Sequence, residues 1–567
     1  EDNAKRRKKV LDNMKKNGHI TQSEYDEAMA DDVYSRIQSI NLETSTSSPY
    51  SYFVDELIDE ILNDLMEQKG YTQTQAYNVL YSGGLSIYTT QDTAIQNICD
   101  EEINNSANYP MSISYSISWA WSVKKTDGTI QNYSEVDLDY YNRVLLGNSS
   151  FKLIFKSTEE CDALIAAFKQ EYLKEGETEI DENLEYTIQP QTSFTVMDQK
   201  TGYVKAIVGG RGEKTRSLTL NRATSTKRQP GSCFKVLTSY APALDTAGYT
   251  LASTIVDEPF NDVNGRPVSN WWGSSYRGTS TLREGIRDSM NVVTVKLLTA
   301  ITPQLGFDYV EDFGITTLIS NKTLDDGSVV SDVNQSLALG GITYGVTNLE
   351  LCAAYATIAN GGVYTEPVLY TKVLDHNGKV ILESNPSTHT VIKDSTAWLL
   401  TSAMEDVVKS GTGTHCKVDG MSVAGKTGTS SKDNDLWFAG YTPYLTATIW
   451  AGYDENAPLT NGVFHEDMWS KIVTRIDDVK GYKEDIGFPA PESVQSATIC
   501  KSSGQLAIEG VCPSTTEYFS KGSIPKDQCN IHSRQIPSTA AVSENGGTNN
   551  VNPATGNANS NASSTGN

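Results

Sequence analysis

A serine followed three residues later by a lysine, in the stretch Gly231-Ser232-Cys233-Phe234-Lys235, is the strongest candidate for chemistry in this chain. A serine hydroxyl is a weak nucleophile at neutral pH and needs a base within hydrogen-bond reach. Residues three apart on a helix lie on one face, and the residues after Lys235 have a helical pattern. Ser232 would then lie in the first helical turn, where free N–H groups and the helix dipole favour a developing anion.

Two further motifs follow this one in the chain. Ser289-Met290-Asn291 adds a second hydroxyl and an amide that can both donate and accept hydrogen bonds. Lys426-Thr427-Gly428-Thr429 adds a second cation, two hydroxyls and a glycine that lets an extended ligand approach the strand closely. Together the three motifs indicate acyl transfer through a serine.

The three motifs resemble the set found in penicillin-binding proteins and β-lactamases. The surrounding sequence is similar to the transpeptidase domain of class A (bifunctional) penicillin-binding proteins, in the stretches RQPGSCFK, RGTSTLREGIRDSMNVVTVKLL, SLALGGITYGVTNLELCAAYATIANGG, VAGKTGTS and DLWFAGYTP. The resemblance runs from about Gly84 to His532 and is strongest from Phe194 to Asp454. Cys233 departs from the Ser or Thr usual in the family.

The resemblance implies catalytic roles for Ser232, Lys235, Ser289 and Lys426. Ser232 would be the nucleophile, Lys235 its base and Ser289 a relay for the proton that passes to the leaving amine. To accept a proton, Lys235 must have a pKa well below its usual value of about 10.4. Burial and the charge of Lys426 would both lower that pKa.

The resemblance also implies how the substrate would be held. Asn291 would contact its amide backbone, while Thr427 and Thr429, with the neighbouring ammonium group, would bind the C-terminal carboxylate beside Gly428. The oxyanion hole would consist of the backbone N–H groups of Ser232 and Thr429. Regular alternation along a strand would point Lys426 and Gly428 to one face and both threonines to the other, so alternation alone does not settle how Lys426 and Thr429 both reach the substrate.

The reaction implied by the resemblance is peptidoglycan D,D-transpeptidation. The serine would attack a stem peptide ending in D-Ala-D-Ala and release the terminal D-Ala. An amine of a second stem peptide would then capture the acyl-enzyme. β-Lactams would acylate the same serine because they mimic the D-Ala-D-Ala end. This chemistry requires no metal and no organic cofactor.

Three other activities are compatible with the motifs. A D,D-carboxypeptidase uses the same residues with water as the acceptor. A β-lactamase needs an additional water-activating carboxylate, and no segment marks one. A non-catalytic sensor or wall-binding module would turn over stem peptides slowly or not at all.

Composition limits the partners and the cellular location that this chain can have. The 567 residues contain 46 Lys and Arg against 70 Asp and Glu, a net charge of −24, which argues against nucleic acid as a partner. No run approaches the roughly 18 apolar residues of a membrane span. The resemblance implies an extracytoplasmic enzyme of the bacterial cell membrane, whose anchor and glycosyltransferase domain precede residue 1.

We expect an α+β fold, with an antiparallel sheet packed by helices and a smaller α+β linker domain. The expected domains are a helical remnant over 1–70, a small interdomain module over 71–190, the transpeptidase domain over 191–490, a Cys-containing tail over 491–535 and a disordered tail over 536–567.

Individual elements follow from local patterns. Two helices are expected within 5–30, the second with a capping box formed by Thr21 and Glu24. The other expected helices are 51–68, 158–174, 281–301 and 394–409, and residues 41–51 read as a loop. The expected strands are 85–90, 112–124, a hairpin from Phe194 to Val208, and the segments 423–429, 436–441 and 446–453.

The eight cysteines are too few for a disulfide-dense scaffold. Cys233 is interpreted as a small buried hydrophobe, with thiol reactivity near the site as the alternative, and His415-Cys416 as weak evidence for a metal. The remaining interior candidates are Cys99, Cys161 and Cys352.

The four residues Cys500, Cys512, Cys529 and His532 lack a Cys-x2-Cys spacing, so zinc is not strongly indicated. A Cys500–Cys512 disulfide is plausible outside the cytoplasm, and the choice stays open.

Four aromatic residues lie near the motifs. Trp271 and Trp272 precede the second motif and are candidates to line an acceptor groove. Trp437 and Tyr441 follow the third motif and are interpreted as core.

Overall fold

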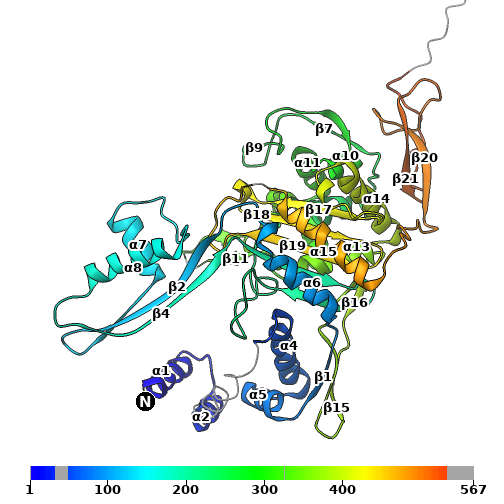
Figure 1. Ribbon diagram of the computed structural model, residues 1–567. Helices are drawn as coiled ribbons and strands as arrows, with labels where there is room; N and C mark the ends of the chain where they lie inside the picture. Colours follow the sequence, from blue (N-terminus) through cyan, green and yellow to red (C-terminus); the bar gives the residue numbers. More distant parts are fainter. Residues whose placement is uncertain (1, 32, 34–48, 325, 461, 533–567) are drawn as a thin grey trace, which may run out of the picture.

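The computed structural model describes residues 2–31, 33, 49–324, 326–460 and 462–532 (Figure 1). Most of the expected 41–51 loop and the whole 536–567 tail lie outside the described residues. Among the described helices, none is long and apolar enough to cross a membrane.

A five-stranded antiparallel sheet, in the order β17-β18-β19-β5-β6, is the centre of the molecule. Every residue of β5, β18 and β19 is buried, so both faces of the sheet are covered. The expected hairpin and the three late strands are confirmed, and so is the α+β class. The bounds are β5 Gln191–Met197, β6 Val204–Val208, β17 Ala424–Thr429, β18 Asp435–Tyr441 and β19 Thr446–Gly452.

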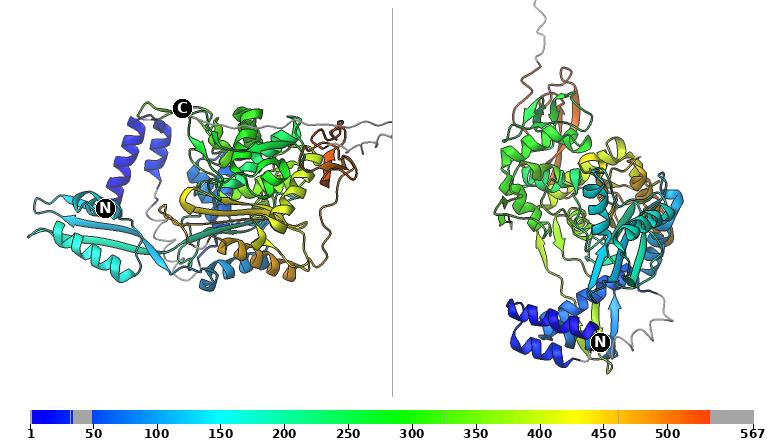
Figure 2. Two further views of the ribbon diagram at one scale, coloured as in Figure 1. Left: turned by 90° about the horizontal axis from the view of Figure 1, so that it is seen from above. Right: turned by 90° about the vertical axis from the view of Figure 1, so that its left-hand side faces the viewer.

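Helices cover the two faces of this sheet (Figure 2). Trp437 and Trp450 face one large cluster, and Phe438 and Ile449 face another, because successive side chains of a strand alternate between faces. The helices on the first face are α10 Leu282–Arg287, α11 Asn291–Ile301, α12 Pro303–Asp312, α13 Asn348–Ala359 and α14 Asp394–Ser410. The helices on the second face are α6 Thr93–Asn104 and α15 Phe464–Lys480.

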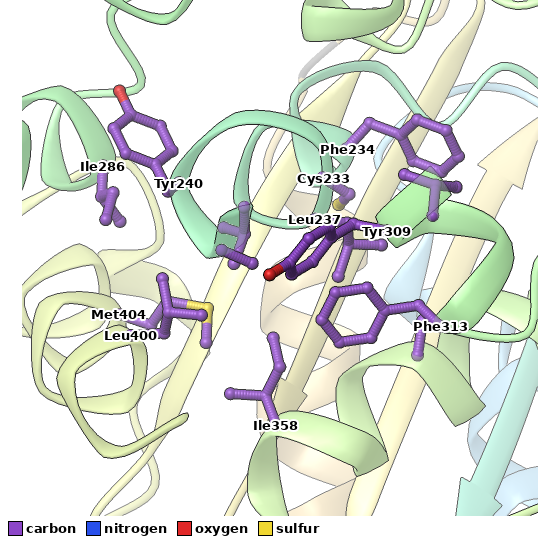
Figure 3. Packing of buried hydrophobic residues seen from close by; sticks show 14 of the residues in the cluster. Cys233, Phe234, Leu237, Tyr240, Ile286, Tyr309, Phe313, Ile358, Leu400 and Met404 are labelled. Carbon is purple, nitrogen blue, oxygen red and sulfur yellow. The ribbon is translucent and has the colours of Figure 1, made fainter. Parts of the chain in front are cut away.

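The segment that begins at Ser232 is helical, as expected, although its turns are not uniform. A 3₁₀ turn, η3 Gly231–Cys233, leads through a π turn, η4 Val236–Tyr240, into α9 Ala241–Asp245. Phe234, Leu237 and Tyr240 pack into the large cluster (Figure 3). This burial fixes the helical segment in place, and with it the position of Ser232.

The prediction of one continuous helix over 281–301 is wrong. α10 begins with a capping box formed by Thr281 and Glu284 and ends at Arg287, and α11 begins at Asn291. Ser289, between them, has a φ of 53°, a left-handed conformation that a helix interior excludes. The apolar spacing continues across this break, which is why the sequence pattern did not reveal it.

Residues 71–190, expected as one small module, pack into more than one hydrophobic cluster. Only the sheet β3-β2-β4 and the helices against it form a separate cluster, built on Trp119, Trp121 and Phe168. α6 instead packs on the large sheet, where Ile95, Ile98 and Ile103 join the cluster of its second face. The module's elements are β2 Ser114–Lys124, β3 Ile130–Ser134, β4 Thr178–Gln189, α7 Glu135–Tyr140 and α8 Thr158–Tyr172.

The helices and the strand expected near the N-terminus are confirmed. The helix that begins at Gln22 carries the expected Thr21–Glu24 capping box. The strand near Ser86 pairs with β14, far along the chain. The bounds are α1 Asp2–Lys16, α2 Gln22–Ala30, α4 Tyr52–Lys69, α5 Gln73–Ser82, β1 Ser86–Thr89, β14 Tyr370–Leu374 and β15 Val380–Glu383.

A C-terminal hairpin, β20 Val494–Cys500 and β21 Ser514–Ser520, lies beside α14 (upper right in Figure 1). The short peripheral elements are β7 Thr254–Asp257, β8 Phe260–Asn261, β9 Pro267–Val268, β10 Gly278–Thr281, β11 Lys322–Thr323, β12 Val329–Val330, β13 Val363–Thr365 and β16 Thr388–Thr390. Short 3₁₀ turns are η1 Ser106–Asn108, η5 Gln335–Leu339, η6 Thr414–Cys416 and η7 Ser431–Asp433, and a π turn is η2 Tyr141–Leu145.

Candidate active site

The first and third motifs meet backbone to backbone. A methyl group on Gly231 would lie 2.4 Å from the carbonyl oxygen of Thr429 and 2.8 Å from its nitrogen. A methyl group on Gly428 would lie 2.4 Å from the carbonyl oxygen of Pro230. Only glycine at both positions permits this approach, and Gly231 also has a φ of 54°. The turn that carries Ser232 is therefore pressed against the edge strand β17.

Lys235 joins the first motif to the second. Its side chain is fully buried, and its Nζ lies 2.6 Å from the carbonyl oxygen of Ser289, 2.6 Å from Asn291 Oδ1 and 3.1 Å from Ser289 Oγ. Lys235 Nζ donates to all three oxygens, so the second motif fixes the position of this nitrogen.

The pKa of Lys235 lies well below its ordinary value, first because the side chain is buried and second because Lys426 is close by. Both causes are those expected from the sequence. A lysine in this state is suited to accept a proton at neutral pH.

The second motif is held rigidly. The backbone N–H of Asn291 donates to Asn270 Oδ1 at 2.9 Å, and its side-chain Nδ2 donates to the carbonyl oxygen of Ser269 at 2.8 Å. With Oδ1 accepting from Lys235, the Asn291 amide is oriented from both ends. The left-handed Ser289 directs both its carbonyl oxygen and its hydroxyl to Lys235 Nζ.

The third motif alternates as a regular strand. Lys426 and Gly428 are buried, Thr427 is half-buried and Thr429 is exposed. Lys426 Nζ donates to the carbonyl oxygen of Thr427 at 3.2 Å and to its hydroxyl at 3.4 Å. Burial lowers the pKa of Lys426 to about 8. The Thr427 hydroxyl also lies 2.7 Å from that of Thr412.

Cys233 packs in the interior, as expected. Its Sγ lies 3.2 Å from the carbonyl oxygen of Lys426, and its own carbonyl accepts a hydrogen bond from the Tyr355 hydroxyl at 2.7 Å. Burial raises the pKa of the Cys233 thiol to about 12. The thiol is therefore neutral, and it anchors β17 behind Ser232.

Comparison with known families decides the identity of this region. Residues 192–457 match the family described as penicillin binding protein transpeptidase domain, and residues 490–534 match the family described as penicillin-binding protein 1A, C-terminal domain. The first match contains all three motifs. The chain carries a penicillin-binding protein transpeptidase domain.

Whole-length relatives agree with this assignment. Penicillin-binding protein 1A of Clostridium tetani is 29% identical over 557 residues, which cover 93% of this chain and 60% of the relative. The Clostridium botulinum protein of the same name is 31% identical over 549 residues, which cover 93% of this chain and 56% of the relative. The chain thus spans little more than half of the length of these relatives.

Solved penicillin-binding proteins share the fold. Penicillin-binding protein 1A from Haemophilus influenzae superposes with a TM-score of 0.57 at 19% identity, covering 93% of this chain and 83% of that one. The PonA1 protein from Mycobacterium tuberculosis, in complex with penicillin V, superposes with a TM-score of 0.53 at 20% identity, covering 78% of this chain and 96% of that one. The class A penicillin-binding protein resemblance inferred from the sequence is confirmed.

Sequence reasoning missed the residues that support the nucleophile turn of this penicillin-binding protein domain. Gln229 exchanges two hydrogen bonds with the backbone of Ile342, and its carbonyl accepts from the indole of Trp437. A methyl group on Gly340 would lie 2.5 Å from the carbonyl oxygen of Gly231. The Gly-Gly pair at 340–341 was the available signal for this close contact.

The aromatic and metal-site candidates near the motifs have the following positions. Trp437 and Tyr441 are core residues, as interpreted. Trp271 is 64% exposed and donates its indole N–H to the carbonyl of Asp288, next to the second motif. Its role in an acceptor groove stays a prediction. His415 pairs with Asp467, while the neighbouring Cys416 is buried.

Proposed function

We propose that this chain is the D,D-transpeptidase portion of a class A penicillin-binding protein and cross-links peptidoglycan stem peptides through an acyl ester on Ser232. The observation that carries the proposal is the environment of Lys235: a fully buried lysine with a lowered pKa, between the second motif and Lys426, one helical turn from the serine hydroxyl.

In the first step, the Ser232 hydroxyl attacks the carbonyl carbon of the penultimate D-Ala. Its proton passes to the lone pair of Lys235 as the new C–O bond forms. The negative charge on the carbonyl oxygen is stabilised by the backbone N–H groups of Ser232 and Thr429. Their close approach is supported by the contact between Gly231 and Thr429. One such donor is typically worth about 3 kcal/mol in the transition state.

In the second step, the C–N bond to the terminal D-Ala breaks, and the leaving amine takes a proton from Lys235 through the Ser289 hydroxyl. The 3.1 Å contact between Lys235 Nζ and Ser289 Oγ supports this relay. An amine of a second stem peptide then attacks the ester and loses a proton by the same route. Ser232 is released with its hydroxyl restored, so protons balance over the cycle.

Substrate binding uses strand β17 and Asn291. The donor peptide lies along β17, beside Gly428, with its terminal carboxylate held by Lys426, Thr427 and Thr429. Asn291 contacts the amide backbone with the N–H of its side chain that Ser269 leaves available. A β-lactam takes the same place and acylates Ser232, so β-lactam antibiotics are expected inhibitors.

The setting follows from the same assignment. We propose that the full-length protein carries this domain on the extracytoplasmic face of the bacterial membrane. We also propose a membrane anchor and a glycosyltransferase domain ahead of residue 1. The partners would be stem peptides that end in D-Ala-D-Ala.

The test uses a synthetic stem peptide with an acceptor amine, and product analysis by mass spectrometry. We expect cross-linked dimer and free D-Ala from the wild-type chain and neither from Ser232→Ala, whose loss in a serine enzyme reaches about 10⁶-fold. Free D-Ala without dimer, even at high acceptor concentration, would instead indicate a carboxypeptidase. Turnover of penicillin with rapid loss of the acyl-enzyme would indicate a β-lactamase.

A further inference from the structure

Three cysteines and a histidine converge at the base of the C-terminal hairpin, away from the Ser232 site. One ligand atom from each of Cys500, Cys512, Cys529 and His532 lies within 4.8 Å of all the others. His532 Nδ1 is 3.3 Å from Cys529 Sγ and 3.5 Å from Cys500 Sγ. Cys500 and Cys529 are buried, and the other two residues are half-buried.

We propose that these four residues form a structural zinc site, with three thiolate sulfurs and His532 Nδ1 as ligands. Zinc bonds of about 2.3 Å to sulfur and about 2.0 Å to nitrogen set the edges of a tetrahedron at about 3.5 Å between nitrogen and sulfur. The two nitrogen–sulfur distances in this group, 3.3 and 3.5 Å, agree with that edge. Soft sulfur ligands with one imidazole favour zinc over magnesium, calcium or manganese.

The ligand spacing and a backbone hydrogen bond nearby are also typical of a metal site. Cys500 ends β20 and Cys512 lies two residues before β21, so the hairpin brings two ligands to one end. Cys529 and His532 supply the other two at a Cys-x2-His spacing, which is the spacing of a zinc knuckle with histidine as its second ligand. The backbone N–H of Ile508 points at Cys512 Sγ at 3.3 Å, as an outer hydrogen bond to a ligand sulfur does.

A disulfide accounts for less of this arrangement. A Cys500–Cys512 bond would use two of the sulfurs and would leave Cys529 and His532 gathered around it without a function. All eight cysteines of the chain are free thiols in the structure. Four ligand atoms around one point are what a tetrahedral ion needs and more than a disulfide needs.

The hairpin also needs a source of stability beyond its core. Its buried apolar cluster contains only Ile499 and Phe519 of its own, together with Ala252 of the main body. A two-stranded sheet with so small a core is marginal in water. Structural zinc contributes its binding free energy directly to folding, and here it would tie the 501–513 loop to residues 529–532. Binding converts three thiols to thiolates and releases three protons.

The experiment measures zinc and thiols in the full chain purified without added metal or reductant. We expect about one zinc per chain by elemental mass spectrometry. We also expect eight titratable thiols once the protein is unfolded in the presence of a chelator. Cys529→Ser and His532→Ala should weaken zinc retention against a competing chelator by more than the roughly 10–100-fold that changes outside the ligand shell cost. The matched control is Cys161→Ala, a buried cysteine of the small module, which should retain zinc fully.

Cobalt(II) supplies a second readout. Added to the chain after zinc removal, it should develop the visible ligand-field absorption of a tetrahedral site and a thiolate charge-transfer band, and His532→Ala should change both. Six titratable thiols without zinc would overturn the proposal in favour of a disulfide. Zinc content unaffected by Cys529→Ser and His532→Ala would also overturn it, as would eight thiols that take up no added zinc. Penicillin acylation is not a readout here, so failure of the zinc site leaves the proposed function untouched.

Discussion

Replacing Gly231 by alanine tests whether the contact between the nucleophile turn and β17 builds the oxyanion hole. The new methyl group would lie 2.4 to 2.8 Å from the carbonyl oxygen, carbonyl carbon and nitrogen of Thr429, so turn and strand must separate. One displaced oxyanion donor costs about 3 kcal/mol, so penicillin acylation should slow by about 10²–10³-fold. The left-handed φ of 54° adds about 1–2 kcal/mol of strain in the folded state.

The assay is the second-order rate of labelling by a fluorescent penicillin, with thermal unfolding measured in parallel. Gly265→Ala is the matched control, because Gly265 has a φ of 77° and no atom within 4 Å of the added methyl. It should lose similar stability through backbone strain and keep its acylation rate. A Gly231→Ala protein that is folded and acylates at the wild-type rate would refute the assignment of the hole to this contact.

Three other perturbations follow from the same geometry. Acylation should fall as pH drops below the lowered pKa of Lys235, because this lysine then becomes charged. Acylation should also fall, about tenfold per pH unit, above about pH 8, where Lys426 loses its charge. Lys426→Arg should shift only the alkaline limb of the pH–rate profile upward, and an unmoved limb would assign that limb to another group. If the Trp271 indole lines the acceptor groove, Trp271→Ala should leave penicillin acylation unchanged and reduce formation of the cross-linked dimer about 5- to 30-fold, a loss of about 1–2 kcal/mol. Equal effects on both reactions would contradict that role. Arg283→Ala should leave the buried Glu517 without its ion-pair partner and cost about 3–5 kcal/mol of stability, measured as faster hydrogen exchange in β20 and β21. The control is Lys409→Ala, which removes an exposed ion pair. Unchanged exchange in the hairpin would show that the Arg283–Glu517 pair does not anchor it.

Much of the architecture could be predicted from the sequence, because the signals are local. Alternating apolar residues located the β5–β6 hairpin of the central sheet, and Thr21 with Glu24 marked a helix start that has the expected capping box. The motif residues could also be predicted as a group, and Lys235 has the environment that its expected role requires.

The missed features depend on contacts that no local pattern encodes. The left-handed Ser289 interrupts an apolar helical repeat, so periodicity predicted one helix where two occur. α6 has an ordinary amphipathic pattern, and only tertiary packing decides that it covers the large sheet rather than the small one. Cys500, Cys512, Cys529 and His532 could be named from the sequence, but their convergence within 4.8 Å could not, because only the hairpin brings positions up to 32 apart together.

The central claim, that Ser232 is the nucleophile, is tested most directly by locating the penicillin adduct. Trypsin should release residues 229–235 as one peptide, which contains both Ser232 and Cys233. Fragmentation of the labelled peptide should place the penicilloyl mass on Ser232 as an ester, and Ser232→Ala should carry none. An adduct on Cys233, or labelling that survives in Ser232→Ala, would contradict the account.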